Sequence, residues 1–458
     1  MDPEFRAFVG DNALSIDLIN IVPLDDLHQP VGVIREAEQL AADAFGADET
    51  LFSVQGTTGA IMTMILSVCA PDDKIILPRN AHKSILAAVI FAGAIPVWVE
   101  PEKDKRLGIE HGVTLTAIRQ AIECNSNVKA VLLINPTYYG TSIDLLKMVE
   151  LIHSYNIPVL VDEAHGTLLH FHDGLPMSAM QAGADMAATS VHKLGGSLTQ
   201  SSVLNVKGNR LNIRRIRSFM SMLTTTSTSY LLLASLDTAR RQLALHGQDL
   251  AEQTICLANE TRRQINEIPG LYCYGEEICS QAGVYEYDPT KLCIHLEKLP
   301  LTGFEAERWL REMYNIEVEL SDLKNILCLI TIGDNKGATS RLIQALRHLT
   351  QTFQLDDKLD YAVPAVIPAA SEFVVTPREA FYLPSESLEW SKTIGRVCTE
   401  FVYVYPPGIP ILMPGQRISL EIVDYIGRHV DAGLPVKGPE DSTMKEIKVV
   451  MKDDFRLK

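Results

Sequence analysis

Between residues 30 and 205 the sequence alternates short buried strands with helices, and this alternation limits the possible folds more than any other feature. The apolar runs typical of buried strands are 74–77, 96–99, 130–134 and 159–161. The helical patterns between them include 31–45, which Gly46 ends, 58–68 and 145–155. Strands that alternate with helices form a parallel sheet with helices on both faces. We therefore predict an α/β fold with a mainly parallel sheet.

The rest of the chain predicts further units. A helical stretch at 229–269 precedes two predicted strands, 291–296 and 326–332, with a helix at 309–314 between them, so we expect a smaller α/β domain. Pro, Asp and Ala are frequent in 353–370, and turn-forming residues mark 405–410 and 413–415. The predicted units are an N-terminal arm (1–30), a large domain (31–240), a small α/β domain (241–352), a linker (353–370) and a short C-terminal module (371–458).

The net charge of −16 disfavours a nucleic-acid partner, which usually needs a basic face. Eight cysteines are present and no two form a CxxC pair, so we expect reduced thiols and a cytoplasmic location. The longest apolar run, 85–99, contains Gly93 and Pro96 and is shorter than the roughly 20 residues that a spanning helix needs. We therefore predict a helix and a buried strand there, and no membrane partner. The first residues do not resemble a signal peptide.

The segment TSVHKLGG, residues 189–196, contains hydroxyl groups, His192 and Lys193 in a glycine-flanked turn. A lysine that forms a Schiff base with a cofactor needs a free amine beside groups that bind phosphate. Ser190 and His192 stand where they could bind that phosphate. Taken alone, the segment is equally compatible with an exposed loop lysine.

Asp162 directly follows the strand predicted at 159–161, at the edge of the sheet where active sites of α/β proteins lie. An acid there can pair with a protonated pyridine nitrogen, although it can also cap the following helix. Thr57 and Thr58 in the segment QGTTG open a helix, where backbone N–H groups bind phosphate well, or where they form an ordinary cap. His82 follows another strand and could stack on a flat cofactor ring.

Two other interpretations of the 162–172 region are weaker. The letters DEAH at 162–165 match a helicase motif, but the phosphate loop GxxxxGK[ST] that such enzymes need is not in the sequence. Asp162 with His165, His170 and His172 could form a metal cluster. No two of these histidines are four residues apart, as helical metal ligands are, so we predict no metal site.

Taken together, these segments resemble the bacterial ornithine/lysine/arginine decarboxylases of the aspartate-aminotransferase fold (PLP fold type I). Within that family the chain is most similar to the shorter biosynthetic arginine decarboxylases of Bacillus-type bacteria. The matching stretches occur in the family's order over nearly the whole chain: 15–18, 24–28, 53–59, 78–84, 162–166, 190–193, 224–227, 376–380 and 405–415. Each is weak alone, and together they are specific.

The resemblance implies pyridoxal phosphate as the cofactor and assigns a role to each matching residue. Lys193 would be the Schiff-base lysine, Asp162 the partner of the pyridine nitrogen, and His82 the residue stacked on the ring. The residues implied to bind the phosphate or other parts of the cofactor are Thr57, Thr58, Ser190, His192 and His165. Thr225 or Ser227 would reach the phosphate of a neighbouring subunit, so the resemblance implies a homodimer, or a tetramer built from two dimers, with shared sites.

The implied reaction is α-decarboxylation of a basic amino acid, with arginine giving agmatine, a polyamine precursor. Lysine or ornithine decarboxylase and an aminotransferase remain alternatives. Members of the family usually carry a Pro-Gly-His-Lys segment just before the point where this chain begins, so an inactive cofactor-binding homologue is a further alternative. For the group that binds the distal guanidinium or ammonium, the candidates are Glu317, Glu319 and Asp322.

Overall fold

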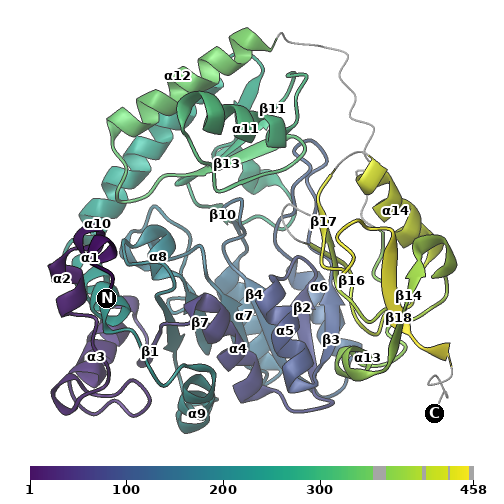
Figure 1. The fold of residues 1–458 in the computed structure, drawn as a ribbon, viewed down its shortest axis with the longest axis horizontal. Helices are drawn as coiled ribbons and strands as arrows, with labels where there is room; N and C mark the ends of the chain where they lie inside the picture. The colour runs from purple at the N-terminus through teal and green to yellow at the C-terminus, as the bar shows by residue number, and fades with distance from the viewer. Residues whose placement is uncertain (354–367, 405–408, 432–433, 453–458) are drawn as a thin grey trace.

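The structure, a computed structural model, describes residues 1–353, 368–404, 409–431 and 434–452 (Figure 1). Most of the predicted linker at 353–370, and residues 405–408 of the turn-rich stretch, lie outside the described residues. The predicted domain boundaries stay predictions.

A seven-stranded sheet forms the centre of the large lower part of the molecule in Figure 1, with strand order β1-β8-β7-β6-β4-β2-β3. The strands from β7 to β3 are parallel to one another, whereas β8 is antiparallel to both β7 and β1. This confirms the predicted α/β fold with a mainly parallel sheet. The strands are β1 (Glu49–Ser53), β2 (Lys74–Pro78), β3 (Ile95–Val99), β4 (Val128–Ile134), β6 (Val159–Asp162), β7 (Met186–Thr189) and β8 (Ser202–Val206).

Side chains that alternate along each strand place apolar groups on both faces of this sheet. On β4, Leu132 faces the helices α4, α5 and α9, while Leu133 faces α6 and α7. The helices around the sheet are α3 (Val33–Phe45), α4 (Gly56–Val68), α5 (Lys83–Ala92), α6 (Leu115–Glu123), α7 (Leu145–Ser154), α8 (Val191–Leu194) and α9 (Ile213–Leu223). Two apolar layers thus hold the sheet, which leaves its carboxyl edge for polar groups.

Gly46 ends α3, as the sequence predicts, with a left-handed φ of 68°. A Cβ at this position would lie 2.5 Å from a ring carbon of His170. Backbone conformation and the available space therefore both require glycine. The predicted helix and strand within 85–99 are also present, as α5 and β3. Because β3 is an edge strand, Ile95, Val97 and Trp98 are half-buried rather than buried.

A four-stranded antiparallel sheet, with order β12-β13-β11-β9, lies above the large sheet in Figure 1. Strand β13 ends at Leu329 and not at the predicted residue 332, because Asp334 accepts hydrogen bonds from the backbone N–H and hydroxyl of Thr331 and so forms a turn. The elements of this region are α10 (Tyr230–Asn266), β9 (Leu271–Cys273), β11 (Lys291–Leu296), α11 (Gly303–Tyr314), β12 (Leu320–Ser321), β13 (Asn325–Leu329) and α12 (Lys336–Thr352). A short two-stranded sheet, β5 (Thr141–Ser142) with β10 (Glu286–Tyr287), joins it to the loops of the large sheet.

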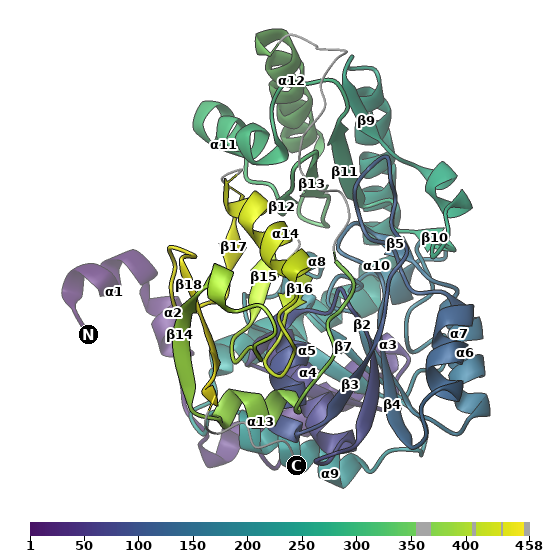
Figure 2. The same cartoon turned by 90° about the vertical axis from the view of Figure 1, so that its right-hand side faces the viewer.

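The C-terminal region forms two further antiparallel sheets, β14-β18 and β16-β15-β17, at the right in Figure 1. Its elements are α13 (Pro377–Tyr382), β14 (Ser385–Glu389), β15 (Val402–Val404), β16 (Ile409–Leu412), α14 (Leu420–Asp431), β17 (Val436–Lys437) and β18 (Glu446–Val450). At the other end of the chain, α1 (Pro3–Val9) and α2 (Asp11–Ser15) form an arm, and Figure 2 shows α1 projecting from the body. No helix in the described part of the chain has the length and apolar character needed to cross a membrane.

Candidate active site

A cavity of about 260 Å³ opens at the carboxyl edge of the large sheet. Asp162 ends β6, and Ser190 follows the last residue of β7. Eight of the ten residues predicted for the site line this cavity: Thr57, Thr58, His82, Asp162, His165, Ser190, His192 and Lys193. The structure thus brings together residues that are up to 136 positions apart in the sequence, from Thr57 to Lys193.

One side of the cavity is a cluster of hydroxyl groups at the N-terminus of α4. Thr57 Oγ1 hydrogen-bonds to Ser190 Oγ, and lies 2.9 Å from Ser202 Oγ. Thr57 and Thr58 are in the first turn of the helix, where backbone N–H groups have no acceptor within the helix. Hydroxyls, free N–H groups and the positive end of the helix dipole suit a bound phosphate.

Lys193 lies in α8, and its Nζ is 2.6 Å from His165 Nε2. Burial lowers the pKa of the Lys193 amine, while the nearby carboxylates of Glu319 and Asp162 oppose that shift. Burial, together with the charge of Lys193, holds the pKa of His165 well below its usual range. The amine therefore faces a neutral imidazole, and the uncharged form of the amine, which can act as a nucleophile, is favoured.

Asp162 is 6% exposed, and its Oδ1 accepts a hydrogen bond from the backbone N–H of Ala164 (3.1 Å). Burial raises the pKa of Asp162 to about 6, against the opposing effects of that hydrogen bond and of Lys193. Among the described residues, no cation forms an ion pair with its carboxylate. A buried acid in this position is suited to a cationic group on a ligand, such as a protonated ring nitrogen.

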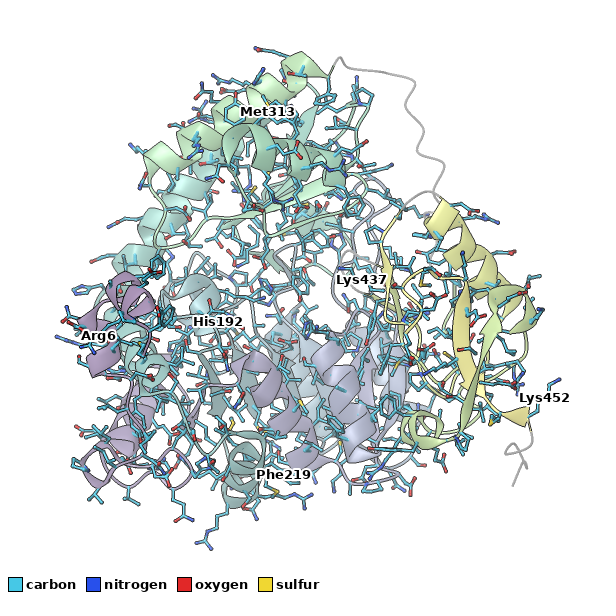
Figure 3. The ribbon with its side chains drawn as sticks, in the orientation of Figure 1. Arg6, His192, Phe219, Met313, Lys437 and Lys452 are labelled. Atoms are coloured by element: carbon cyan, nitrogen blue, oxygen red, sulfur yellow. The ribbon has the colours of Figure 1, made fainter. Side chains whose placement is uncertain are left out.

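Two histidines line the cavity with their rings held by hydrogen bonds. His82 Nδ1 lies 2.8 Å from Ser84 Oγ, and burial, with the charge of Lys193, lowers the pKa of His82 to about 4. His192 Nδ1 donates to the carbonyl of Ser201 at 2.8 Å. In Figure 3 His192 lies near the middle of the molecule, whereas Arg6 and Lys452 lie at its edges.

Sequence reasoning missed several residues of the site. The ring of Tyr138 packs on His165 with centroids 4.5 Å apart, and Ser202, Asn80 and Gln200 lie in or beside the cavity. The signal for Tyr138 is its place in the loop after β4, three residues beyond Asn135. Ser202 lies at the start of β8, a strand that the sequence analysis did not identify.

Thr225 and Ser227 are exposed and do not line the cavity of their own chain. The backbone N–H of Ser227 donates to Thr225 Oγ1 (3.3 Å), and the carbonyl of Thr225 lies 3.0 Å from His28 Nε2. Their role toward a neighbouring subunit stays a prediction.

The three acids that were candidates for a distal cationic group are in different environments. Glu317 pairs with Arg311 on the surface (2.7 Å), and Asp322 is buried against the hydroxyl of Tyr139 (2.9 Å) and the amide of Asn325 (2.9 Å). Only Glu319, among these three, has its carboxylate near the cavity, with Oε1 4.0 Å from Lys193 Nζ.

The alternative of a metal cluster finds no support in the described residues, where no group of three or more His, Cys, Asp or Glu side chains could hold a metal ion. His170 contacts Ser178 (3.3 Å), and His172 pairs with Glu252 (2.7 Å). The cavity instead combines a phosphate-binding helix end, a buried acid, a lysine amine and aromatic rings. It also holds an orphaned buried polar atom, His165 Nδ1, which has no hydrogen-bond partner among the described residues. This set of groups fits pyridoxal phosphate.

Family models identify the chain. The model of the Orn/Lys/Arg decarboxylase major domain matches residues 1–338, and that of the C-terminal domain matches residues 364–434. The chain belongs to the Orn/Lys/Arg decarboxylase family. An arginine decarboxylase of Bacillus subtilis is 57% identical over 450 residues, which cover 98% of this chain and 92% of that protein. An arginine decarboxylase of Bacillus anthracis is 56% identical, over 98% of this chain and 91% of that protein.

Solved structures with the same fold match most of the chain. A lysine decarboxylase of Francisella novicida matches with a TM-score of 0.84 at 21% identity, over 98% of this chain and 76% of that one. A serine palmitoyltransferase of Sphingomonas wittichii matches with a TM-score of 0.59 at 15% identity, over 77% of this chain and 84% of that one. At these identities the matches show the fold alone, and that fold is PLP fold type I.

Proposed function

We propose that this chain is a pyridoxal-phosphate-dependent decarboxylase that converts L-arginine to agmatine and carbon dioxide, a step toward polyamines. The observation that carries the proposal is the pairing of the Lys193 amine with the His165 imidazole, opposite a buried Asp162. The identity with the Bacillus arginine decarboxylases, which extends over 98% of the chain, supports arginine as the substrate.

In the proposed site Lys193 would hold the cofactor through its amine, and Thr57, Thr58, Ser190 and His192 would hold the phosphate. Asp162 would keep a proton on the ring nitrogen, and His82 would lie beside the ring. When bound, pyridoxal phosphate supplies an electron sink for the pair left behind when the carboxylate departs. The chain's own part in the reaction is orientation and proton transfer.

Proton balance assigns a task to the Lys193–His165 pair. Decarboxylation breaks the bond to the carboxylate carbon, and one proton must be added to the α-carbon as carbon dioxide leaves. Lys193 Nζ is the proposed proton donor, and His165 Nε2 lies 2.6 Å from it. Because the pKa of His165 is held well below its usual range, its imidazole does not retain a proton and can pass one back to the Lys193 amine.

Glu319 is the residue that we propose binds the substrate's distal guanidinium. It approaches the cavity from the residue before β12, on the four-stranded sheet, and it faces Lys193 Nζ at 4.0 Å. A carboxylate can accept two parallel hydrogen bonds from a guanidinium, which the single ammonium of lysine cannot reproduce.

The direct test is release of carbon dioxide from arginine, lysine and ornithine with added pyridoxal phosphate, and identification of each product. We expect agmatine from arginine, with the highest kcat/KM of the three substrates. A higher kcat/KM for lysine would overturn the proposal that arginine is the substrate, but the proposed decarboxylase activity would stand. Formation of a keto acid would identify an aminotransferase, and an absorbance band near 420 nm without carbon dioxide would identify an inactive cofactor-binding homologue.

We further propose a homodimer, or a tetramer built from two dimers, in which Thr225 or Ser227 completes the partner's phosphate site. Both residues are exposed at the end of α9. The exposed apolar residues Phe8 (87%) and Val22 (98%) on the N-terminal arm support a covered surface there. Lys193→Ala chains mixed with Thr225→Ala/Ser227→Ala chains should regain activity, because some heterodimers contain one intact site. No recovery after verified exchange would contradict shared sites.

A further inference from the structure

Lys291, the first residue of β11, is a second buried lysine close to the site, with 0% of its surface exposed. Its Nζ forms an ion pair with Asp288 and lies 3.4 Å from Thr290 Oγ1. It also donates a hydrogen bond to the backbone carbonyl of His165, at 2.9 Å. A residue of the four-stranded sheet thus holds the peptide that carries the imidazole facing Lys193.

Asp288 extends this connection to a second loop of the cavity. Its backbone N–H donates to the carbonyl of Gly140 at 2.7 Å, and Gly140 belongs to the loop after β4 that carries Tyr138. Tyr138 in turn packs on the His165 ring. Asp288 and Lys291 therefore hold both loops from which the His165–Tyr138 contact is built.

The contact between Lys291 and the loop that carries Gly140 is tightly packed. A Cβ at Gly140 would lie 2.8 Å from the Lys291 Cβ, and Gly140 has a φ of 90°. Arg262 donates to the carbonyls of Pro289 and Lys291, at 3.2 Å for the latter, which fixes the start of β11 from the side of α10. These contacts fix the backbone and the first side-chain atoms of Lys291, and its amine is held by Asp288 and the carbonyl of His165.

We propose that Lys291 and Asp288 form a positioning pair, which sets the placement of His165 against Lys193. The inference rests on the proposed function, because it treats Lys193 as the amine that binds the cofactor. It goes beyond that function because neither Lys291 nor Asp288 lines the cavity.

The charge of Lys291 acts on both partners of the pair. Burial is the largest cause of the lowered pKa of Lys193, and Lys291 adds to it. The pKa of His165 is lowered most by burial, next by the charge of Lys193, and then by the charge of Lys291. The other titratable groups that face Lys193 are Asp162 from β6, Glu319 from before β12, His82 from before α5 and Tyr138 from the loop after β4.

The experiment measures the Lys193 amine directly in the full chain. Competitive acetylation with acetic anhydride, read by mass spectrometry over a range of pH, gives a labelling midpoint for Lys193 in the absence of pyridoxal phosphate. The same variants are then saturated with pyridoxal phosphate, and the pH dependence of the visible absorbance is recorded. Neither measurement requires turnover.

We expect the two members of the pair to shift this midpoint in opposite directions. Lys291→Met removes a positive charge and should raise the midpoint by about half a pH unit. Asp288→Asn leaves the Lys291 charge without its counter-ion and should lower it. Lys291→Arg keeps the charge and should restore much of the wild-type midpoint. A purely structural role would move the midpoints of Lys291→Met and Asp288→Asn in the same direction or leave both unchanged.

Lys207→Met is the matched control. Lys207 also donates to two backbone carbonyls, those of Gly46 (3.0 Å) and Met180 (2.8 Å), and it lies outside the cavity. Its loss should lower stability and leave the Lys193 midpoint unchanged. If Lys291→Met does not fold, the Asp288→Asn arm decides, and an unchanged midpoint there overturns the proposal. If the wild-type chain releases no carbon dioxide, the proposed function is overturned. The labelling midpoints of Lys193 still test the positioning pair, because they do not depend on turnover.

Discussion

Two lysines, one partly buried in the cavity and one fully buried beside it, show how the same side chain can have different roles. Lys193 lies in the cavity, and its closest carboxylate is 4.0 Å away. Lys291 is fully buried and has Asp288, Thr290 and a backbone carbonyl as partners. A buried ammonium without a close counter-ion loses stability, whereas one with partners can stay charged. The cavity thus contains an amine whose pKa is lowered, whereas the amine of Lys291 beside the cavity has hydrogen-bond partners on all sides.

Two adjacent acids repeat this contrast. Asp162 faces the cavity with one hydrogen bond from the backbone N–H of Ala164. Glu163 points away from it and accepts hydrogen bonds from the backbone N–H of Ala179 (2.6 Å) and the hydroxyl of Thr189 (3.2 Å). Asp162 ends β6 and lines the cavity, whereas Glu163, the next residue, is tied into the fold by its two hydrogen bonds.

The largest expected effect follows from removing the cavity amine. Lys193→Ala should abolish both turnover and the borohydride-fixed attachment of pyridoxal phosphate, because the amine that attacks the cofactor is gone. Lys207→Ala is the control and should keep both. Fixation at another lysine with retained activity would transfer the role of Lys193 elsewhere.

The next effect concerns the acid of the cavity. Asp162→Asn should still bind the cofactor but lose 100-fold or more in kcat, about 3 kcal/mol, because an amide does not hold a proton on the ring nitrogen. Glu163→Gln is the matched control on the opposite side of the strand and should stay within a few-fold of wild type. Near-normal turnover of Asp162→Asn would contradict the proposal that Asp162 acts on the cofactor while Glu163 does not.

A smaller effect is expected at the edge of the four-stranded sheet. Glu319→Gln should lower kcat/KM for arginine by about 10-fold, near 1.4 kcal/mol, through a weaker hold on the guanidinium. Glu317→Gln, which alters only the surface pair with Arg311, should have no effect on the same constant. Equal losses of kcat/KM in both variants would argue that neither carboxylate binds the substrate.

Sequence patterns predicted the parallel sheet and eight of the residues that line the cavity, because both depend on local signals. A buried strand followed by a polar residue locates Asp162, and a glycine-flanked turn locates Lys193. Strands β1, β7 and β8 were missed, since MAAT in β7 and SVLNV in β8 carry small or polar residues and are buried only through the sheet. Lys291 and Asp288 gave no signal either, because their link to His165 spans more than 120 residues and exists only in the folded chain.

The smallest expected effect tests Glu163 as the acid that serves the fold. Burial raises the pKa of Glu163 from 4.5 to about 8, so the folded chain binds this proton more tightly than the unfolded chain does. Ionisation of Glu163 therefore opposes folding, and its contribution to stability falls as pH rises from 4.5 to about 8. Glu163→Gln cannot ionise, so its Tm relative to wild type should rise across this window. The Tm of Glu163→Gln relative to wild type should be lowest near pH 4.5, where the protonated Glu163 of the wild-type chain keeps both hydrogen bonds. Thermal unfolding of both proteins over this range measures the difference, and parallel Tm curves would show that Glu163 does not titrate there.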